Sequence, residues 1–201
     1  MRKALLHLKK ADPVLGGLIE RIGRYAIEYL EPGYESLAKA IIYQQLSGKV
    51  AEVIFNRLAE ATGDGRLTPE AALRLTPARM RELGLSKQKI AYLRHLAERT
   101  LSGEVDFAAL RRLPDRLVYQ RLMALKGIGP WTVQMFLIFA LRRPNVLPAA
   151  DLGIRVAVQK AYGLAELPTP AQVEELARRW RPYCTVASWY LWRSLETKAG
   201  L

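Results

Sequence analysis

The sequence predicts an all-α fold, and three observations support this class. A capping residue stands before a proline at four places, the arrangement typical of helix starts: Asp12-Pro13, Thr68-Pro69, Thr76-Pro77 and Thr169-Pro170. Glycines follow the periodic segments where helices usually end, namely Gly63, Gly84, Gly103 and Gly163. No run alternates apolar and polar residues for long enough to indicate a strand.

These signals place the helices of the first half of the chain. A helix over 13–23 follows Asp12-Pro13, and an apolar stretch predicts the next over 35–45. Ser47 can cap a helix over 48–62. Thr68-Pro69 and Thr76-Pro77 start helices over 69–75 and 77–83, and Ser86 can cap one over 87–101.

The second half continues in the same way. Periodicity predicts a helix over 115–124, and Pro130 starts one over 130–142. Further helices are expected over 152–162, ending at Gly163, over 170–180 behind Thr169-Pro170, and over 185–197. Two segments, 37–43 and 131–141, are apolar on every side, which predicts that they lie in the middle of the packed domain.

Composition and charge restrict the function classes. The chain has 201 residues, a net charge of +12 and a pI of about 10, and such an excess attracts polyanions. Nucleic acid is the first candidate partner, while anionic membranes and ribosomal surfaces also select basic chains. The longest uncharged run, 127–141, is too short to span a membrane, and no signal peptide precedes Lys9.

Cysteine and histidine usage argues against several metal sites. Cys184 is the only cysteine, which excludes an intrachain disulfide, a four-cysteine zinc site and a cysteine-bound iron–sulfur cluster. His7 and His95 lie far apart in polar helical contexts, where surface histidines are the ordinary interpretation.

A glycine pair at Gly127-Ile128-Gly129 lies between two expected helices. Glycine permits positive φ and close approach to a ligand, and the amides that open the following helix can bind a phosphate. A plain helix–helix turn remains the alternative. Leu125 and Ile128 can anchor this hairpin in the core, and Lys126 adds a positive charge beside the glycines.

Asp151 stands between Pro148-Ala149-Ala150 and an apolar helix. Taken alone, it is best interpreted as a helix N-cap. A catalytic carboxylate at this position would need a DNA clamp and an aromatic pocket elsewhere in the chain.

Four ordered motifs together carry a resemblance to a known family. They are Ile-Ile-Tyr-Gln-Gln-Leu-Ser at 41–47, Leu-Lys-Gly-Ile-Gly-Pro-Trp-Thr at 125–132, Leu-Pro-Ala-Ala-Asp-Leu-Gly-Ile-Arg at 147–155, and Arg-Pro-Tyr at 181–183 with Ala-Ser-Trp-Tyr-Leu-Trp-Arg at 187–193. This set resembles the helix-hairpin-helix/Gly-Pro-Asp superfamily of base-excision DNA glycosylases, in its 3-methyladenine DNA glycosylase II branch. The resemblance covers roughly residues 30–197.

The resemblance implies a single domain over 1–201 with two helical lobes flanking a cleft. The central lobe is expected over about 35–125, and the second lobe combines the N-terminal helix with about 126–201. Some relatives carry an N-terminal β-rich domain, for which too few residues precede Tyr34.

In this family the aspartate at the position of Asp151 is catalytic, and the resemblance implies monofunctional hydrolysis. Bifunctional relatives have a lysine where this chain has Trp131. A non-catalytic damaged-DNA-binding module and a bifunctional glycosylase/lyase remain the alternatives. The expected partner is double-stranded DNA containing alkylated bases, bound by a monomer in the cytoplasm or nucleoid.

The resemblance also assigns residues to the base pocket and to the wedge that fills the space of a flipped nucleotide. Trp131 and Trp192 are the expected pocket aromatics, whereas Trp189 is expected in the core. Gln45 and Leu46 align with the wedge, and capping of buried backbone by Gln44 and Gln45 is the alternative. The remaining pocket positions are Tyr43, Met135 and Leu152, the last two where some relatives have tyrosines.

Contacts to the DNA backbone and a cation site complete the expectations. The family often holds a monovalent cation, sodium or potassium, on hairpin carbonyls, which here would be those of Met123, Leu125 and Ile128; no other cofactor is expected. Cys184 stands where an arginine is common. Predicted backbone contacts are Lys126, Gly127, Gly129, Thr132, Lys87, Lys89 and Arg155, with solvated helix charges as the alternative for the basic residues.

Overall fold

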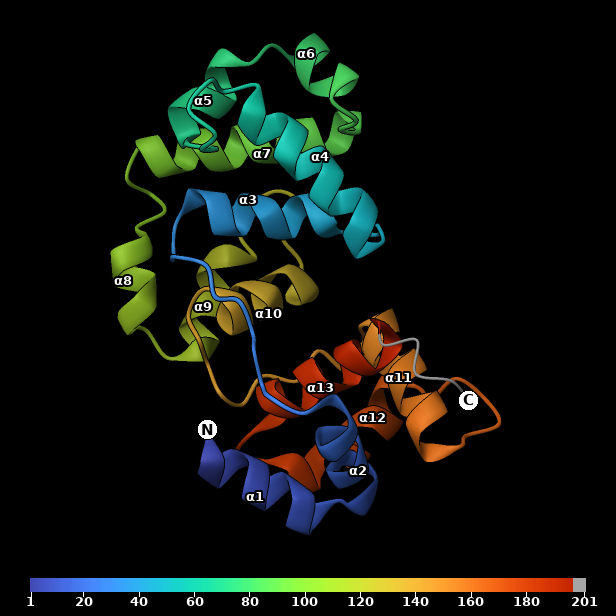
Figure 1. Cartoon of the computed structure of the whole chain (residues 1–201). Coiled ribbons are helices and arrows are strands. Elements are labelled where there is room, and N and C mark those ends of the chain that lie inside the picture. Colours follow the sequence, from blue (N-terminus) through green and yellow to red (C-terminus); the bar gives the residue numbers. More distant parts are fainter. Residues whose placement is uncertain (197–201) are drawn as a thin grey trace. The chain divides into compact units, whose positions relative to one another are not determined.

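The computed structural model describes residues 1–196, and every regular element in that range is a helix (Figure 1). The all-α prediction is therefore confirmed. None of these helices is both long and apolar enough to cross a membrane. The first seven helices are α1 (Arg2–Ala11), α2 (Pro13–Ile22), α3 (Tyr34–Tyr43), α4 (Gly48–Glu60), α5 (Pro69–Arg74), α6 (Pro77–Glu82) and α7 (Lys87–Leu101). They are followed by α8 (Phe107–Arg112), α9 (Asp115–Leu122), α10 (Pro130–Phe139), α11 (Leu152–Tyr162), α12 (Pro170–Ala177), a short 3₁₀ turn η1 (Arg178–Trp180) and α13 (Cys184–Glu196).

The helix starts follow the predicted capping chemistry. The side chains at all four cap–proline pairs accept a hydrogen bond from the backbone N–H three residues further on, and Ser86 does the same. Ser47 occupies the N-cap of α4 without a side-chain bond. The four predicted terminating glycines, Gly63, Gly84, Gly103 and Gly163, all have positive φ, which they adopt without a Cβ penalty.

Two helices were not predicted from the sequence. α1 begins after Met1, which makes no side-chain cap, so the usual start signal is missing; its buried Ala4 and Leu8 are four residues apart on one face. α8 spans six residues, too few for a periodic pattern, although Asp106 caps it. The predicted helix over 170–180 is observed as α12 followed by the 3₁₀ turn η1. The predicted end of the last helix, at residue 197, lies outside the described residues.

The chain forms two compact units. Unit 1 contains Met1–Glu28 and the chain from Arg142 onward, and unit 2 contains Tyr29–Leu141. The expected lobe boundary near residue 125 differs from this division, because residues 126–141 group with the preceding helices. The reason is that α10 packs against α3 and α9 of unit 2.

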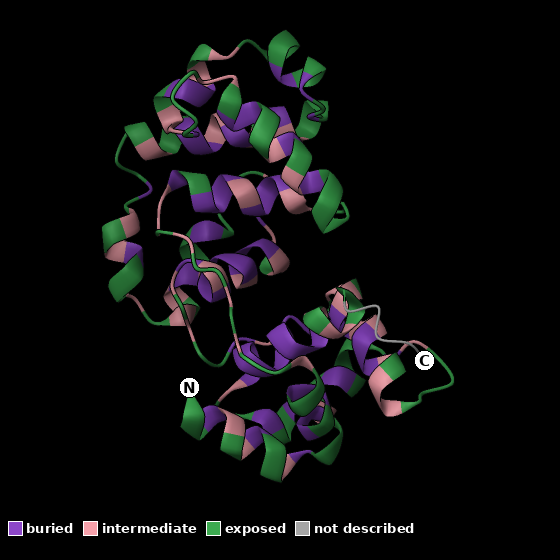
Figure 2. Cartoon of the chain, in the orientation of Figure 1, coloured by how far each residue is buried: buried purple, intermediate pink, exposed green. Residues whose placement is uncertain are grey.

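Unit 2 is built around α3. This helix packs against α4, α7 and α10, and no side chain between Leu37 and Tyr43 is fully exposed (Figure 2). α10 likewise has no exposed residue from Trp131 to Ala140. Both predictions of a helix enclosed on all sides are confirmed, and the two helices flank the segments at 44–47 and 125–130 that carry the family motifs.

Unit 1 places α11 against α13 and α2. All eight residues from Cys184 to Leu191 of α13 are buried. Asp12 is also buried, and its carboxylate accepts from Leu15 N, from the Tyr162 hydroxyl at 2.6 Å and from Trp180 Nε1 at 2.8 Å. Because Tyr162 is the last residue of α11, this network fixes the end of the helix that starts after Asp151.

Candidate active site

Asp151 stands at a loop-to-helix junction that is anchored on both sides. Its backbone N–H donates to Pro148 O at 2.9 Å, and the preceding Pro148 and Ala149 are buried. Its Oδ1 accepts from Ile154 N at 2.9 Å, so Asp151 is the N-cap of α11 as the local sequence predicted. The carboxylate is half-buried, at the positive end of the helix dipole.

Trp192 supplies a second donor to the same oxygen. Its indole Nε1, on α13, lies 2.9 Å from Asp151 Oδ1 across 41 residues of sequence. A backbone amide from α11 and an indole N–H from α13 therefore meet on one carboxylate oxygen. Two donors from different helices restrict the rotation of the side chain, which is the preorganisation that an electrostatic catalyst requires.

Gly153 makes this arrangement possible, a role that was not predicted from the sequence. A Cβ added at Gly153 would lie 3.0 Å from Asp151 Oδ1 and 3.2 Å from Trp192 Cδ1. Any larger residue would push the carboxylate or the indole away. Leu152, beside it, is 63% exposed. The signal that could have identified Gly153 is a glycine in the first turn of a helix, where its poor helix propensity needs an explanation.

The hairpin over residues 125–130 has the expected anchors. Leu125 and Ile128 are buried, which confirms their predicted packing into the core. Gly127 has φ +78°, and a Cβ there would lie 2.2 Å from ring carbons of Tyr92, so the tyrosine ring packs directly on this glycine. Gly129 is the N-cap of α10 and has open space around its missing Cβ. Gly127 therefore serves packing, whereas Gly129 leaves room for a ligand to approach.

The turn at 44–47 carries two glutamines in different settings. Gln45 has φ +57° and is exposed, and Leu46 is 38% exposed beside it. Gln44 is half-buried, and its Nε2 donates to Gly127 O at 2.7 Å and to Thr132 Oγ1 at 2.8 Å. The alternative interpretation as a cap of buried backbone is thus confirmed for Gln44.

Three of the predicted DNA-backbone side chains are engaged within their own unit. Thr132 is 1% exposed and accepts from Gln44, so its hydroxyl is not presented to a phosphate. Lys89 Nζ donates to Ile42 O and Gln44 O, both at 2.7 Å, and burial lowers its pKa. Arg155 Nε donates to Pro168 O at 2.7 Å. Long polar side chains reach free carbonyls at helix ends and in loops, which sequence alone does not reveal.

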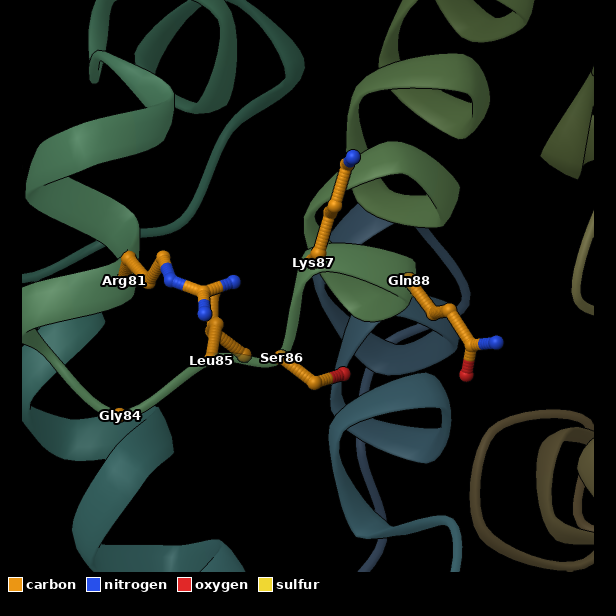
Figure 3. A pocket seen from close by; sticks show the side chains of 6 residues that line it. All are labelled: Arg81, Gly84, Leu85, Ser86, Lys87 and Gln88. Carbon is orange, nitrogen blue, oxygen red and sulfur yellow. The ribbon is translucent and has the colours of Figure 1, made fainter.

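Lys87 and Lys126 are exposed, as a phosphate contact requires. Lys87 lines a shallow surface hollow with Arg81, Gly84, Leu85, Ser86 and Gln88, at the point where α6 leads into α7 (Figure 3). The view shows Lys87 and Gln88 extending from the first turn of α7 toward different sides. Positive side chains and the N-terminal amides of a fifteen-residue helix therefore share one surface.

The predicted pocket residues divide by burial. Trp131 and Trp192 are half-buried, while Met135 is 8% exposed within the packing of α10. Trp189 is 7% exposed and forms edge-to-face contacts with Tyr25 and Tyr190, which confirms that it belongs to the core.

Tyr43, also assigned to the pocket, donates its hydroxyl to Glu52 of α4. Burial, and then the hydrogen bond and charge of Glu52, raise the pKa of Tyr43. Burial alone would raise the pKa of Glu52, but hydrogen bonds from Tyr43 and Lys39 and the charge of Lys39 hold it below its ordinary value. This Tyr43–Glu52–Lys39 cluster ties the end of α3 to α4 on either side of the 44–47 turn.

Comparison with known proteins places these features in a family. Residues 38–182 match the family described as "HhH-GPD superfamily base excision DNA repair protein". DNA-3-methyladenine glycosylase 1 of Schizosaccharomyces pombe is 38% identical over 200 residues, covering 96% of this chain and 87% of the relative. A putative DNA-3-methyladenine glycosylase of Bacillus subtilis, YfjP, is 32% identical over 81% of this chain, which spans 59% of that relative.

A solved structure has the same fold. The 3-methyladenine DNA glycosylase of Schizosaccharomyces pombe, in complex with abasic DNA, superimposes with a TM-score of 0.92 at 36% identity, covering 99% of each chain.

Proposed function

Because the chain belongs to the HhH-GPD superfamily of base excision DNA repair proteins, we propose that it is a monofunctional DNA glycosylase acting on alkylated purines. The expected substrates are 3-methyladenine and 7-methylguanine in duplex DNA, hydrolysed at the N-glycosidic bond after base flipping. The observation that carries this proposal is the Asp151 carboxylate, held by N–H groups of Ile154 and Trp192 at the start of α11.

The chemistry suits a fixed carboxylate. Cleavage of an N-glycosidic bond builds positive charge on the sugar, as in other glycoside hydrolyses. A carboxylate beside the anomeric carbon stabilises that charge and can orient the attacking water. Since an alkylated purine already carries positive charge, it leaves without a dedicated general acid. Asp151 would supply the electrostatic stabilisation, and Trp192 would hold it in place.

Trp131 supports hydrolysis rather than lyase chemistry. An indole cannot form the imine that a lysine at this position would form with the sugar. A half-buried tryptophan can instead stack on a cationic base, a contact worth about 0.5–2 kcal/mol. Within the same unit, Tyr43 and Met135 would line the base pocket with Trp131, and Met135 would make this side of it more aliphatic than in some relatives.

The hairpin and the exposed cations would hold the DNA backbone. Gly129 and the amides opening α10 offer a phosphate site with room for close approach, beside the exposed Lys126. Lys87 and the N-terminus of α7 would contact a second phosphate. Gln45 and Leu46, both exposed, would fill the space that the flipped nucleotide leaves.

A monovalent cation fits the hairpin chemistry. Met123 is the C-cap of α9, where helix carbonyls carry partial negative charge, and Leu125 O accepts only a long bond of 3.3 Å from Ile128 N. The carbonyl oxygens of Met123, Leu125 and Ile128 would hold the ion. When bound, it would add positive charge between the hairpin and a DNA phosphate. One site serves one lesion, so we propose that the protein acts as a monomer.

Base release from defined duplexes tests this function. The substrates are duplexes each carrying one alkylated purine, incubated with excess protein and scored for free base and for strand nicking before and after alkali. We expect free base, and nicking only after alkali. Binding to the damaged duplex without base release would instead identify a damage-binding module, and nicking before alkali with a borohydride-trapped adduct would identify a lyase.

A further inference from the structure

Gln44 connects two surface elements of unit 2 that are far apart in sequence. Its side-chain amide lies between the 44–47 turn and the 125–130 hairpin, bonded to Gly127 O and Thr132 Oγ1 across 83 and 88 residues. One NH₂ group has two hydrogens, and both are used. The contacts fix the hairpin tip and the first turn of α10 relative to the turn that exposes Gln45.

A second connection runs through α7. Lys89 Nζ donates to the carbonyls of Ile42 and Gln44, which fixes the backbone of the turn. Three residues further on, Tyr92 packs its ring against Gly127 of the hairpin. Residues three apart lie on the same face of a helix, so one turn of α7 supports both elements. The turn and the hairpin are therefore joined directly through Gln44 and indirectly through α7.

We propose that Gln44 is a positioning residue that couples the phosphate-binding hairpin to the wedge turn. The phosphate contacts of the hairpin and the inserted side chains of the turn are then held at a fixed distance from each other. This inference rests on the proposed function, because it assigns DNA contacts to both elements. Base flipping costs a few kcal/mol, which inserted side chains must offset. An insertion held at a fixed distance from bound phosphates loses less conformational entropy than a loose one.

The two adjacent glutamines have different roles, since Gln45 is suited to insert into DNA and Gln44 supports the turn that carries it. Gln45 points into solvent from a left-handed backbone position and is suited to touch DNA. Gln44 is bonded inward and touches protein. Loss of the Gln44 amide should therefore leave the phosphate contacts of the hairpin intact but allow the wedge turn to move. This coupling predicts weaker distortion of bound DNA at unchanged affinity.

The test uses Gln44→Met, which keeps side-chain length and removes both donors, and Thr132→Val, which removes one acceptor. Gln120→Met, at an exposed position of α9, is the matched control. The probe is a duplex with a tetrahydrofuran abasic analogue next to 2-aminopurine, whose fluorescence reports unstacking at saturating protein without any chemistry. Affinity for undamaged duplex and single-turnover release of 7-methylguanine are measured in parallel.

We expect Gln44→Met to lose most of the fluorescence rise and to release base roughly tenfold to a hundredfold more slowly, with affinity within about threefold of wild type. Thr132→Val should show a smaller effect in the same direction, and it decides the outcome if Gln44→Met melts at room temperature. Wild-type fluorescence in the folded variants would overturn the coupling, as would a wild-type protein that produces no rise. Absence of base release by wild type would refute the glycosylase function alone, because the fluorescence signal does not depend on excision.

Discussion

Trp192 donates its indole N–H to the carboxylate oxygen of Asp151 that also caps α11, at 2.9 Å. The contact joins the N-terminal end of α11 to α13. The eight residues of α13 that precede Trp192 are all buried. Trp192, which we propose as a pocket aromatic, is therefore also the donor that orients this carboxylate. The two roles differ in which atoms they need, since stacking uses the ring face and orientation uses Nε1.

Trp192→Phe separates these roles, because it keeps an aromatic ring and removes the N–H. A hydrogen bond to a charged group is worth about 1.5–3 kcal/mol, so we expect single-turnover excision to slow by roughly tenfold to a hundredfold. Affinity for the damaged duplex should change little. The single-turnover excision rate and the affinity for the damaged duplex are both measured for wild type and for Trp192→Phe. Normal excision together with weaker binding would show that the indole only stacks.

Gly153→Ala should impair excision without loss of stability. The added methyl group would lie 3.0 Å from Asp151 Oδ1, so the carboxylate or the indole must shift. The backbone itself favours alanine, by roughly 1 kcal/mol in a helix. Gly17→Ala is the matched control, since that helical glycine has open space around it. Thermal melts and excision rates of both variants are compared, and an excision rate unchanged by Gly153→Ala would contradict the proposed close packing.

Cys184 should resist alkylation in the native protein. Burial raises the pKa of its thiol to about 11, and the residue is 1% exposed. At pH 8.5 the thiolate is therefore scarce and shielded, and iodoacetamide should modify the protein only after unfolding in urea. Mass spectrometry of samples taken over time measures this directly. Rapid stoichiometric labelling without urea would contradict the packing of α13.

Glu52 should make stability depend on pH below its ordinary pKa of 4.5. Its pKa is lowered in the folded state, so the unfolded chain binds more protons between the two values. The contribution of Glu52 is therefore present above pH 4.5 and is lost as pH falls through the folded pKa. Glu52→Gln should be less stable than wild type at pH 6, and the difference should shrink at pH 3.

Urea midpoints at the two pH values measure that difference, with Glu60→Gln on the exposed side of α4 as the control. A gap between wild type and Glu52→Gln that grows toward low pH would contradict the sign of the effect.

The sequence predicts those parts of the fold that depend on neighbouring residues. Helix starts at cap–proline pairs are correct because one side chain and one amide decide them. α1 was missed because Met1 provides no cap, and its stability comes from packing on α2 and η1. The assignment of 126–141 to the second lobe differs from the structure because chain order does not state which neighbour α10 packs against.

The site shows the same division. Asp151 could be identified by motif, and its capping bond is local. Other contacts depend on partners tens of residues away in the sequence. They are the bond from Trp192 to Asp151, the bond from Lys89 to the Ile42 carbonyl and the bond from Gln44 to the Gly127 carbonyl. Gln44 and Gln45 are identical and adjacent, yet the first is half-buried and the second is exposed. The chain changes direction at Gln45, which has a positive φ that the sequence does not signal.

The most direct test of the account compares wild type with Asp151→Asn on a duplex carrying one alkylated purine. Asparagine caps helices about as well as aspartate, so the variant should fold and bind DNA normally. We predict that base release falls by at least roughly a hundredfold while affinity for the duplex is retained. Wild-type turnover by Asp151→Asn would contradict the catalytic assignment of this carboxylate.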